Sequence, residues 1–257
     1  PASGPLGQLG RQAPVGVVRF GHPAAVRDQH HGGGGGGHGG NLPPMPEPLV
    51  GVGPHPEPWP DDPRLDPELL AEGDRRNVVD RYRYWTVDAI VADLDTRRHP
   101  FHVAIENWQH DLNIGTVVRC ANAFLAAEVH IVGRKRCNRR GAMVTDRYQH
   151  VRHHPTIDEL AEWAAGESLP VWGVDNLPGA VPLESAELPR RVVLLFGQEG
   201  PGLSDAAREA ADRTLSIAQF GSTRSINAGV AAGIAMHAWI RTHATPGGAE
   251  ADGTVTR

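Results

Sequence analysis

The sequence predicts an α/β fold with a mostly parallel sheet and helices on both faces, and three observations support this. From residue 99 onward, short apolar runs alternate with longer segments whose apolar residues recur at helical spacing. Strands that are separated by helices imply parallel pairing, with the helices covering the sheet. The chain has 257 residues, 40% of them hydrophobic, which is enough for one sizeable core or for one domain plus a tail.

Residues 1–60 are expected to form a disordered tail. This segment is dominated by Pro, Gly and His, which cannot bury enough apolar surface to offset the entropy of the chain. A metal site at His30, His31 and His38 is one interpretation, but the glycines at 32–37 are flexible and would hold ligands poorly. Another interpretation is that residues 1–60 are an upstream extension that has no function. Residues 245–257 are expected to be a flexible C-terminal tail.

Residues 61–98 are expected to form a short helical extension that packs on the main domain. Asp66 is a suitable N-cap and Pro67 follows at the first helical position, so a helix is predicted from there to about Arg76, interrupted by Gly73. Thr86 is a candidate cap for a second helix. The apolar stripe of that helix consists of Val87, Ile90, Val91 and Leu94.

The main domain is expected between residues 99 and 244. Strands are predicted at 101–105, 129–132, 171–174, 192–196 and 214–217, and helices at 114–125, 157–165, 203–211 and 226–240. The strongest strand is Val192–Phe196, five apolar residues followed by Gly197. Ligands of such sheets bind beyond the carboxyl ends of the strands, so chemistry is expected just after residues 105, 174, 196 and 217.

The first segment with unusual polar residues follows the first strand. It begins with Glu106 and Asn107 and continues from Asn113 to Arg119. Asn113 is placed to cap the following helix, and a helix start favours anions. Arg119 could hold an RNA phosphate in a bidentate fork. The alternative is an ordinary capped helix with a surface arginine.

The second segment, residues 196–203, places three glycines between a buried strand and a helix. This allows a tight turn and the close approach of backbone to a ligand. It has neither the spacing of a dinucleotide fingerprint nor the Lys-Ser/Thr of a phosphate loop. Glu199 would repel a phosphate but attract a sulfonium, the positive group of S-adenosylmethionine. The alternative is a glycine turn with a solvated glutamate.

The third segment, residues 217–227, is a polar loop between a short strand and a long helix. Ser225 or Asn227 caps this helix, which is rich in small residues. Small residues permit close packing against a neighbouring helix or a dimer partner.

Together the three segments resemble the SpoU/TrmH branch of the SPOUT methyltransferases. The family pattern is N-x-G-x-x-x-R, then G-x-E-x-x-G, then S-L-N-V. Here the pattern stands as Asn113–Gly115–Arg119, Gly197–Glu199–Gly202 and Ser225-Ile226-Asn227-Ala228. The resemblance covers residues 99–244. It implies an S-adenosylmethionine-dependent RNA 2'-O-methyltransferase with a C-terminal trefoil knot, an exception to the general absence of knots, and a homodimer.

The resemblance also assigns roles to residues. Arg119 would be catalytic, with Asn113, Glu199, Ser225 and Asn227 around the transferred methyl group and the RNA. Residues that would bind the cofactor are Asp175, Leu195, Gly197, Gly202, Ile217 and Ile226. The reaction requires no metal. A free guanidinium is a poor base, so Arg119 is expected to bind phosphate and stabilise the developing 2'-alkoxide.

The chain departs from the family pattern near the third motif. Ala218-Gln219 stands where the family often has Pro-Met, and Arg224 stands where glutamate is frequent. Both changes are expected to affect the rim of the cofactor pocket or the RNA contact.

A basic segment is the candidate for RNA contact. Between residues 133 and 155, seven basic residues face one acid, Asp146, although the whole chain carries a net charge of −5. Basic groups neutralise phosphates and aromatic rings stack on bases. The candidates are Arg134, Lys135, Arg136, Arg139, Arg140, Arg147, Tyr148 and Arg152. The alternatives are a solvated loop or a packing surface for an acidic partner subunit.

The RNA target stays open between tRNA and rRNA. Glu106-Asn107 leads directly into the first motif, as in TrmH-type tRNA enzymes, and the separate N-terminal RNA-binding domain of many ribosomal members is missing, so tRNA is favoured. A non-catalytic binding protein of the same fold is the main rival. A hydrolase or dehydrogenase is disfavoured because its motifs are missing.

The remaining composition points to the cytoplasm. Cys120 and Cys137 have neither disulfide-framework nor zinc-site spacing and are expected to be reduced thiols. No apolar run approaches the roughly 18 residues that cross a membrane, and the start of the sequence lacks the order of a secretory signal.

Overall fold

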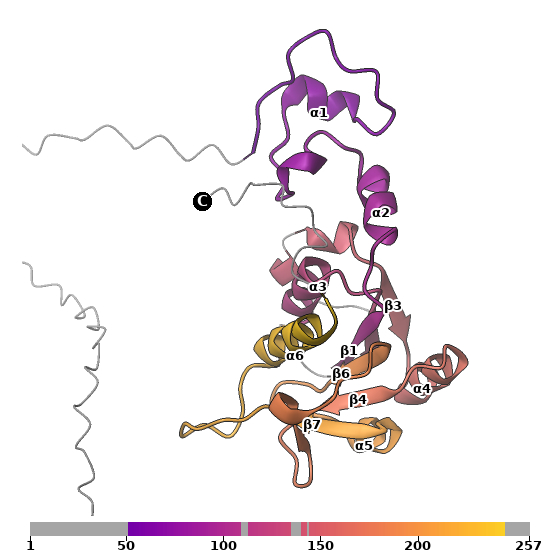
Figure 1. Ribbon diagram of the computed structural model, residues 1–257, viewed down its shortest axis with the longest axis vertical. Coiled ribbons are helices and arrows are strands. Elements are labelled where there is room, and N and C mark those ends of the chain that lie inside the picture. Colours follow the sequence, from indigo (N-terminus) through magenta and orange to yellow (C-terminus); the bar gives the residue numbers. More distant parts are fainter. Residues whose placement is uncertain (1–50, 109–112, 135–139, 143, 245–257) are drawn as a thin grey trace, which may run out of the picture. The chain divides into compact units, whose positions relative to one another are not determined.

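The computed structural model describes residues 51–108, 113–134, 140–142 and 144–244. Its centre is a seven-stranded sheet in the order β3-β2-β1-β6-β4-β7-β5 (Figure 1). Every neighbouring pair of these strands is parallel, as predicted. The strands are β1 Phe101–Asn107, β2 Val129–Gly133, β3 Val151–His154, β4 Val171–Val174, β5 Val181–Pro182, β6 Val192–Phe196 and β7 Arg213–Ser216.

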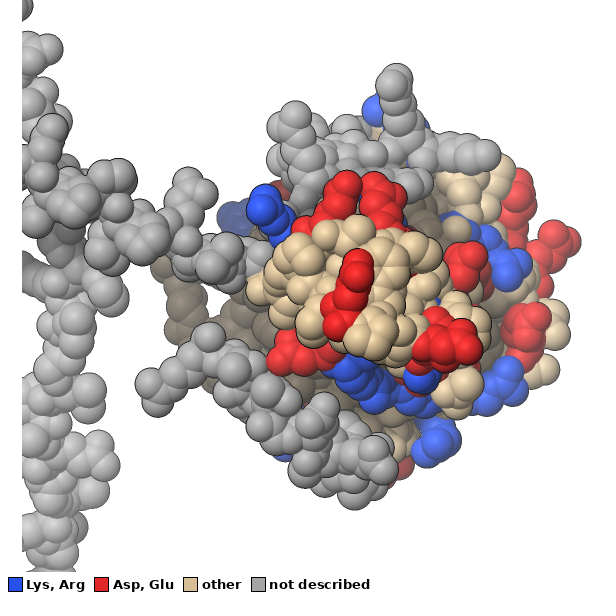
Figure 2. All heavy atoms as spheres, turned by 90° about the horizontal axis from the view of Figure 1, so that it is seen from above, with Lys and Arg blue, Asp and Glu red and all other residues tan. Residues whose placement is uncertain are grey.

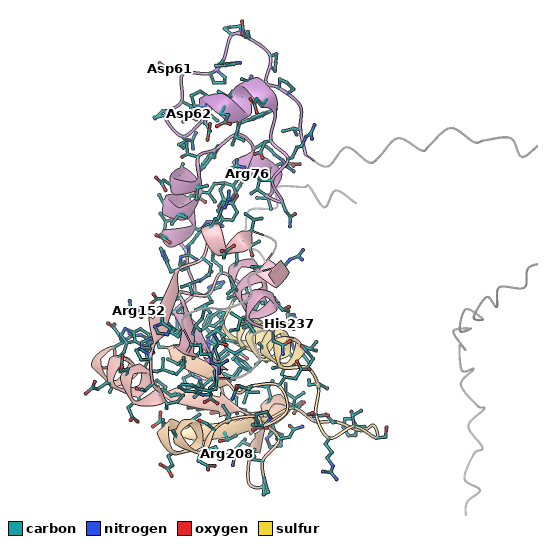
Figure 3. All side chains as sticks on the ribbon, turned by 180° about the vertical axis from the view of Figure 1, so that it is seen from behind. Asp61, Asp62, Arg76, Arg152, Arg208 and His237 are labelled. Atoms are coloured by element: carbon teal, nitrogen blue, oxygen red, sulfur yellow. The ribbon has the colours of Figure 1, made fainter. Side chains whose placement is uncertain are left out.

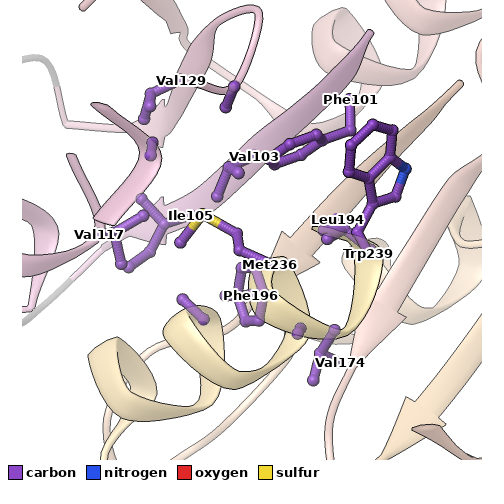
Figure 4. Packing of buried hydrophobic residues seen from close by; sticks show 14 of the residues in the cluster. Phe101, Val103, Ile105, Val117, Val129, Val174, Leu194, Phe196, Met236 and Trp239 are labelled. Atoms are coloured by element: carbon purple, nitrogen blue, oxygen red, sulfur yellow. The ribbon is translucent and has the colours of Figure 1, made fainter. Parts of the chain in front are cut away.

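Helices cover both faces of the sheet, which confirms the predicted α/β class. The α-helices are α1 Pro67–Glu72, α2 Val87–Asp95, α3 Ile114–Ala123, α4 Ile157–Gly166, α5 Asp205–Ala210 and α6 Ala228–His243. On one face, Phe101, Val103 and Ile105 of β1 pack with Met236 and Trp239 of α6 (Figure 4). On the other face, the intervening residues of β1 and β6 pack under α4 and α5.

Two elements of the sheet were not predicted. β3 has the sequence Val-Arg-His-His, whose polar residues hide a strand, and it lies at the edge of the sheet. β5 has only two residues and pairs with β7. Helix α1 ends at Glu72 instead of about Arg76, because Gly73 adopts a φ of 92° that ends the helix.

The helical extension is organised around the buried carboxylate of Asp74. This carboxylate accepts hydrogen bonds from the guanidinium and backbone N–H of Arg76 and from the backbone N–H of Tyr84. Burial raises the pKa of Asp74, but these hydrogen bonds outweigh burial and hold its pKa below the usual value. The backbone of Asp74 also pairs with Val52. The described extension therefore starts at residue 51, within the segment that composition assigns to the tail.

The extension packs on the main domain through helix α2, as expected. Ile90 and Leu94 of α2 are buried together with Tyr82 and with Tyr148 of the main domain. Cys120 is a free thiol on α3, whereas Cys137 lies outside the described residues. Within the described part of the chain, no helix is long and apolar enough to span a membrane.

Candidate functional site

A cavity of about 320 Å³ opens beyond the carboxyl ends of β4, β6 and β7. This is the edge of the sheet where ligands were expected. Eight of the predicted site residues line it: Asp175, Gly197, Glu199, Gly202, Ile217, Ser225, Ile226 and Asn227. Gln219 and Arg224, the two departures from the family pattern, lie in the same lining.

A chain of hydrogen bonds joins the three motifs beside this cavity. The amide nitrogen of Asn113 donates to Glu199 Oε2 over 3.0 Å. The amide nitrogen of Asn227 donates to Asn113 Oδ1 over 2.8 Å. These residues come from segments that are 86 and 114 positions apart, so only the fold brings them together. Asn113 is thus the link between the glycine turn and the start of α6.

The direction of this chain of hydrogen bonds follows from the helix start. Asn227 caps α6, because its Oδ1 accepts from the backbone N–H groups of Gly229 and Val230. Its amide nitrogen is therefore left to donate to Asn113, whose own amide nitrogen must then face Glu199. Since two donors cannot bond one another, this order requires an acceptor at position 199, which the Glu199 carboxylate provides.

Asn113 does not cap α3 with its side chain, contrary to prediction. Its backbone carbonyl accepts the first helical hydrogen bond from Val117, at 2.9 Å, but the side chain makes no cap bond. The reason is competition, because the Asn113 amide is already bonded to Glu199 and Asn227. The prediction for the third motif left Ser225 and Asn227 open, and Asn227 is the cap.

The glycine turn after β6 is closed by its own backbone. Gln198 and Gly202 exchange both backbone hydrogen bonds, at 3.0 and 3.1 Å. A Cβ at Gly197 would overlap the carbonyl group of Gly202, and Gly202 itself has a φ of 72°. The glycines therefore serve the predicted tight turn, and they leave backbone as the wall of the cavity.

Two residues at the end of β4 connect the loops around the cavity. The carboxylate of Asp175 accepts from the backbone N–H of Leu203 at 3.0 Å and of Asn176 at 2.8 Å. The Asn176 side chain accepts from the backbone N–H of Ile217 at 3.2 Å. Asp175, predicted to bind the cofactor, thus lines the cavity and also holds the glycine turn in place. Asn176 was missed, although a polar residue directly after an apolar strand is the signal that would have found it.

A buried glutamate at the end of β1, Glu106, also holds the chain around the glycine turn in place. Glu106 is fully buried, and its carboxylate accepts from the backbone N–H of Ser204 at 2.8 Å and from the Trp108 indole at 2.7 Å. The backbone N–H of Trp108 donates to Gln198 Oε1 at 3.1 Å. Glu106 and Gln198 are therefore positioning residues, which the sequence indicated only as polar residues at strand ends.

Three predicted site residues lie outside the cavity lining, and one of them, Asn113, is held beside it by Glu199 and Asn227. Leu195 is fully buried under α4 and α5, so its side chain cannot contact a cofactor in the cavity. The error has a simple cause, because successive residues of β6 face opposite sides of the sheet. Arg119 is exposed on α3, and it lies outside the cavity lining of its own chain.

The residues of the predicted basic segment do not all lie on one side of the sheet. Arg134 is exposed at the carboxyl end of β2, on the same edge of the sheet as the cavity. Arg147 is exposed just before the amino end of β3, and Arg152 pairs with Glu128 at 3.1 Å. Lys135, Arg136 and Arg139 lie outside the described residues, and Arg140 is described only by its backbone, in the short helix Arg140–Ala142.

The prediction that Tyr148 stacks on RNA is wrong. Its side chain is 6% exposed and packs in the cluster that joins the extension to the main domain. No ring face is left for a base. In the view of Figure 2, acidic and basic side chains are interspersed, and no uniform basic coat covers that face.

Comparison with known proteins places this geometry in a family. The SpoU rRNA Methylase family matches residues 100–237, which is more than half of the chain. A protein of Mycobacterium sp. (strain KMS), named an uncharacterized tRNA/rRNA methyltransferase, is 34% identical over 140 residues, 52% of this chain and 44% of that protein. The chain spans about half the length of the mycobacterial relatives it matches.

Two further likenesses concern a bacterial enzyme and a solved structure. The tRNA (guanosine(18)-2'-O)-methyltransferase of Escherichia coli (strain K12) is 26% identical over 153 residues, 58% of this chain and 67% of that protein. The SpoU methyltransferase AviRb from Streptomyces viridochromogenes, solved in complex with AdoMet, is 25% identical with a TM-score of 0.52, over 58% of this chain and 60% of that one. Because the family match includes every segment that lines the cavity, the chain belongs to the SpoU methylase family.

Proposed function

We propose that the chain transfers a methyl group from S-adenosylmethionine to a ribose 2'-hydroxyl of structured RNA. The observation that carries the proposal is the link through Asn113 between Glu199 and Asn227, which assembles the three motifs beside one cavity. The relatives support the same chemistry, since one is named a tRNA 2'-O-methyltransferase and another was solved with AdoMet.

The cavity suits the proposed cofactor in size and chemistry. Its volume of about 320 Å³ lies within the usual range of small-molecule sites. Glu199 offers a carboxylate to a positive sulfonium, and the turn 197–202 offers backbone groups to adenine and ribose. Gln219 Oε1 is buried in this region with no hydrogen-bond partner among the described residues, so it can accept a hydrogen bond from the cofactor. That the chain forms a trefoil knot around this cavity stays a prediction.

The reaction is an in-line displacement. The ribose 2'-oxygen attacks the methyl carbon, the carbon–sulfur bond breaks, and the electron pair stays on sulfur, which leaves as a neutral thioether. The proton of the 2'-hydroxyl would pass in the same step through Arg119 or a neighbouring group to solvent. The chain must therefore align oxygen, carbon and sulfur and stabilise negative charge on the attacking oxygen.

Replacing Arg119 with lysine tests the role of its guanidinium. Lysine keeps the charge but loses the planar fork that holds ribose and phosphate together. We expect Arg119→Lys to reduce methyl transfer by about 100-fold while S-adenosylmethionine binding is kept. Transfer of labelled methyl to bulk tRNA and calorimetry of cofactor binding are the measurements. Arg190→Lys, also exposed but outside α6, is the matched control. A near wild-type rate for Arg119→Lys would remove this residue from the mechanism.

Two substitutions of Asn227 separate its cap from its link to Asn113. Asn227→Asp keeps an acceptor for the helix start but replaces the donor to Asn113 with a second acceptor. The cap should hold α6, so stability should fall less than in the alanine variant, while methyl transfer falls roughly 10- to 100-fold. Asn227→Ala loses both and should also destabilise the protein by about 1 kcal/mol. Urea unfolding and methyl-transfer assays distinguish these effects. If the aspartate variant is fully active, the hydrogen-bond link has no part in catalysis.

We propose that RNA contact centres on Arg134 rather than on the whole basic segment. Arg134 lies at the carboxyl end of β2, on the same edge of the sheet as the cavity but outside its lining. Its backbone is fixed by Asn107, whose side chain donates to the Arg134 carbonyl at 2.7 Å. Arg152, by contrast, is held by Glu128 at the amino end of β2.

Salt titrations of RNA binding test this assignment. Arg134→Ala should weaken tRNA binding and reduce the slope of log affinity against log salt by about 1, the loss of one phosphate contact. Arg152→Ala should leave the slope unchanged. Filter binding over a range of salt concentrations measures both. Equal slopes for the two variants would contradict the assignment.

tRNA is the favoured substrate over rRNA. The support is the direct step from Glu106-Asn107 into the first motif and the E. coli relative that acts on tRNA guanosine. Mass spectrometry of tRNA and rRNA from a strain that lacks the protein would identify the target by the 2'-O-methyl nucleotide that disappears.

We also propose a homodimer that buries one face of α6. Val230 is 53% exposed and Ile234 is 40% exposed, and the two lie one turn apart on α6, whose first residues line the cavity. Ile234→Glu should convert a dimer into a monomer in sedimentation velocity runs. Ala165→Glu adds the same charge to an exposed position of α4 and should leave the dimer intact. A monomeric wild type would end this proposal.

A further inference from the structure

Three histidines lie in a diagonal row across the sheet, away from the cavity. His102 comes from β1, His130 from β2 and His154 from β3, and all three contact Trp163 of α4. His130 is fully buried. Glu128 directly precedes β2, so it joins His102 and His130 near the amino ends of their strands, whereas the cavity is at the carboxyl ends.

The ring nitrogens and the carboxylate converge on a small space. His102 Nδ1 and His130 Nε2 are 3.1 Å apart. Glu128 Oε2 is 3.8 Å from the same His130 nitrogen. All three ligand atoms lie within 4.8 Å of one another. Two imidazole nitrogens and one carboxylate oxygen form a donor set that Zn²⁺ accepts in proteins.

We propose that His102, Glu128 and His130 bind one divalent transition-metal ion, with Zn²⁺ as the best match. Nitrogens that lie about 2.0–2.1 Å from a tetrahedral Zn²⁺ are separated by roughly 3.4 Å, close to the spacing of the two imidazoles. The Glu128 carboxylate needs to move closer, and its partner Arg152 is about half exposed and can follow it (Figure 3). The fourth position is left for solvent.

His154 and Trp163 orient the central ligand, His130. To bind metal through Nε2, His130 must carry its proton on Nδ1. His130 Nδ1 lies 2.9 Å from His154 Nε2, which can accept that proton's hydrogen bond. Trp163 packs on His130 with ring centroids 4.1 Å apart and ring planes tilted by 36°, and it covers the site. The ion would thus join β1 to β2 directly and reach edge strand β3 through His154.

Positive charge lies close to the proposed ligands. Burial lowers the pKa of His102 to about 4, and the positive charge of Arg152 contributes to this shift. Arg191 is a further cation near His102, so Glu128 is needed to offset positive charge around the ion.

The competing interpretation is a metal-free row of hydrogen-bonded imidazoles. That row accounts for the contacts among the three rings, and in it Glu128 serves only as the ion-pair partner of Arg152. The two interpretations differ in one measurable respect, because only the first requires Glu128 for binding of a metal ion.

Cobalt titration of the full chain tests the proposal. After treatment with chelator, the purified protein is titrated with Co²⁺, whose visible bands report tetrahedral nitrogen and oxygen ligands, and then with Zn²⁺ as competitor. We expect one ion per chain and a rise in Tm with Zn²⁺. His102→Gln and Glu128→Gln should abolish both effects. His154→Gln should weaken affinity about 10- to 100-fold.

Two controls keep the test decisive. His153→Gln removes a neighbouring histidine that bonds the Gly133 carbonyl and should bind metal as wild type does. A full chain with His30→Gln, His31→Gln and His38→Gln should also keep the bands. Loss of the bands in that triple variant, or their persistence in folded Glu128→Gln protein, would overturn the site. Because cofactor binding is measured separately, failure of the metal site leaves the methyltransferase proposal standing.

Discussion

The hydrogen bonds of Asn113 are the constraint on which the functional site depends. One amide side chain satisfies a carboxylate on the glycine turn and an amide at the start of α6 at the same time. The two partners, Glu199 and Asn227, lie in loops that are distant from Asn113 in the sequence, so local structure alone does not bring them together. The cap on α6 sets the polarity of the whole arrangement, so a helix start far along the chain decides which atom faces Glu199.

The sheet supplies the rigid frame for these loops. Its central strands β1 and β6 are buried on both faces, so their carboxyl ends are fixed in space. Polar residues at those ends bind the neighbouring loops through hydrogen bonds. Glu106 holds the start of α5, and Asp175 holds the end of the glycine turn. Both do so by accepting from backbone N–H groups, which are donors that no substitution elsewhere can remove.

The sequence predicted those parts of the fold in which periodicity and composition agree. The apolar run of β6 and the capped, striped helix α2 were confirmed because local pattern and burial point the same way. Edge strand β3 was missed because an edge strand tolerates polar residues, and its histidines look like a loop. Tyr148 was assigned to RNA from its neighbours in sequence, whereas its burial depends on Ile90 and Leu94, more than 50 positions earlier. The side chain of Asn113 was misassigned for the same reason, since its partners are remote.

The glycine of the first motif serves architecture. A Cβ at Gly115 would lie 2.7 Å from the backbone nitrogens of Gly141 and Ala142, so two stretches of main chain touch there with no side chain between them. Gly115 is one of the motif residues by which the family is recognised, and a steric contact of the main chain explains it without any role in the reaction. A relative that had lost all activity would still need this glycine, so its presence is evidence of shape and not of turnover.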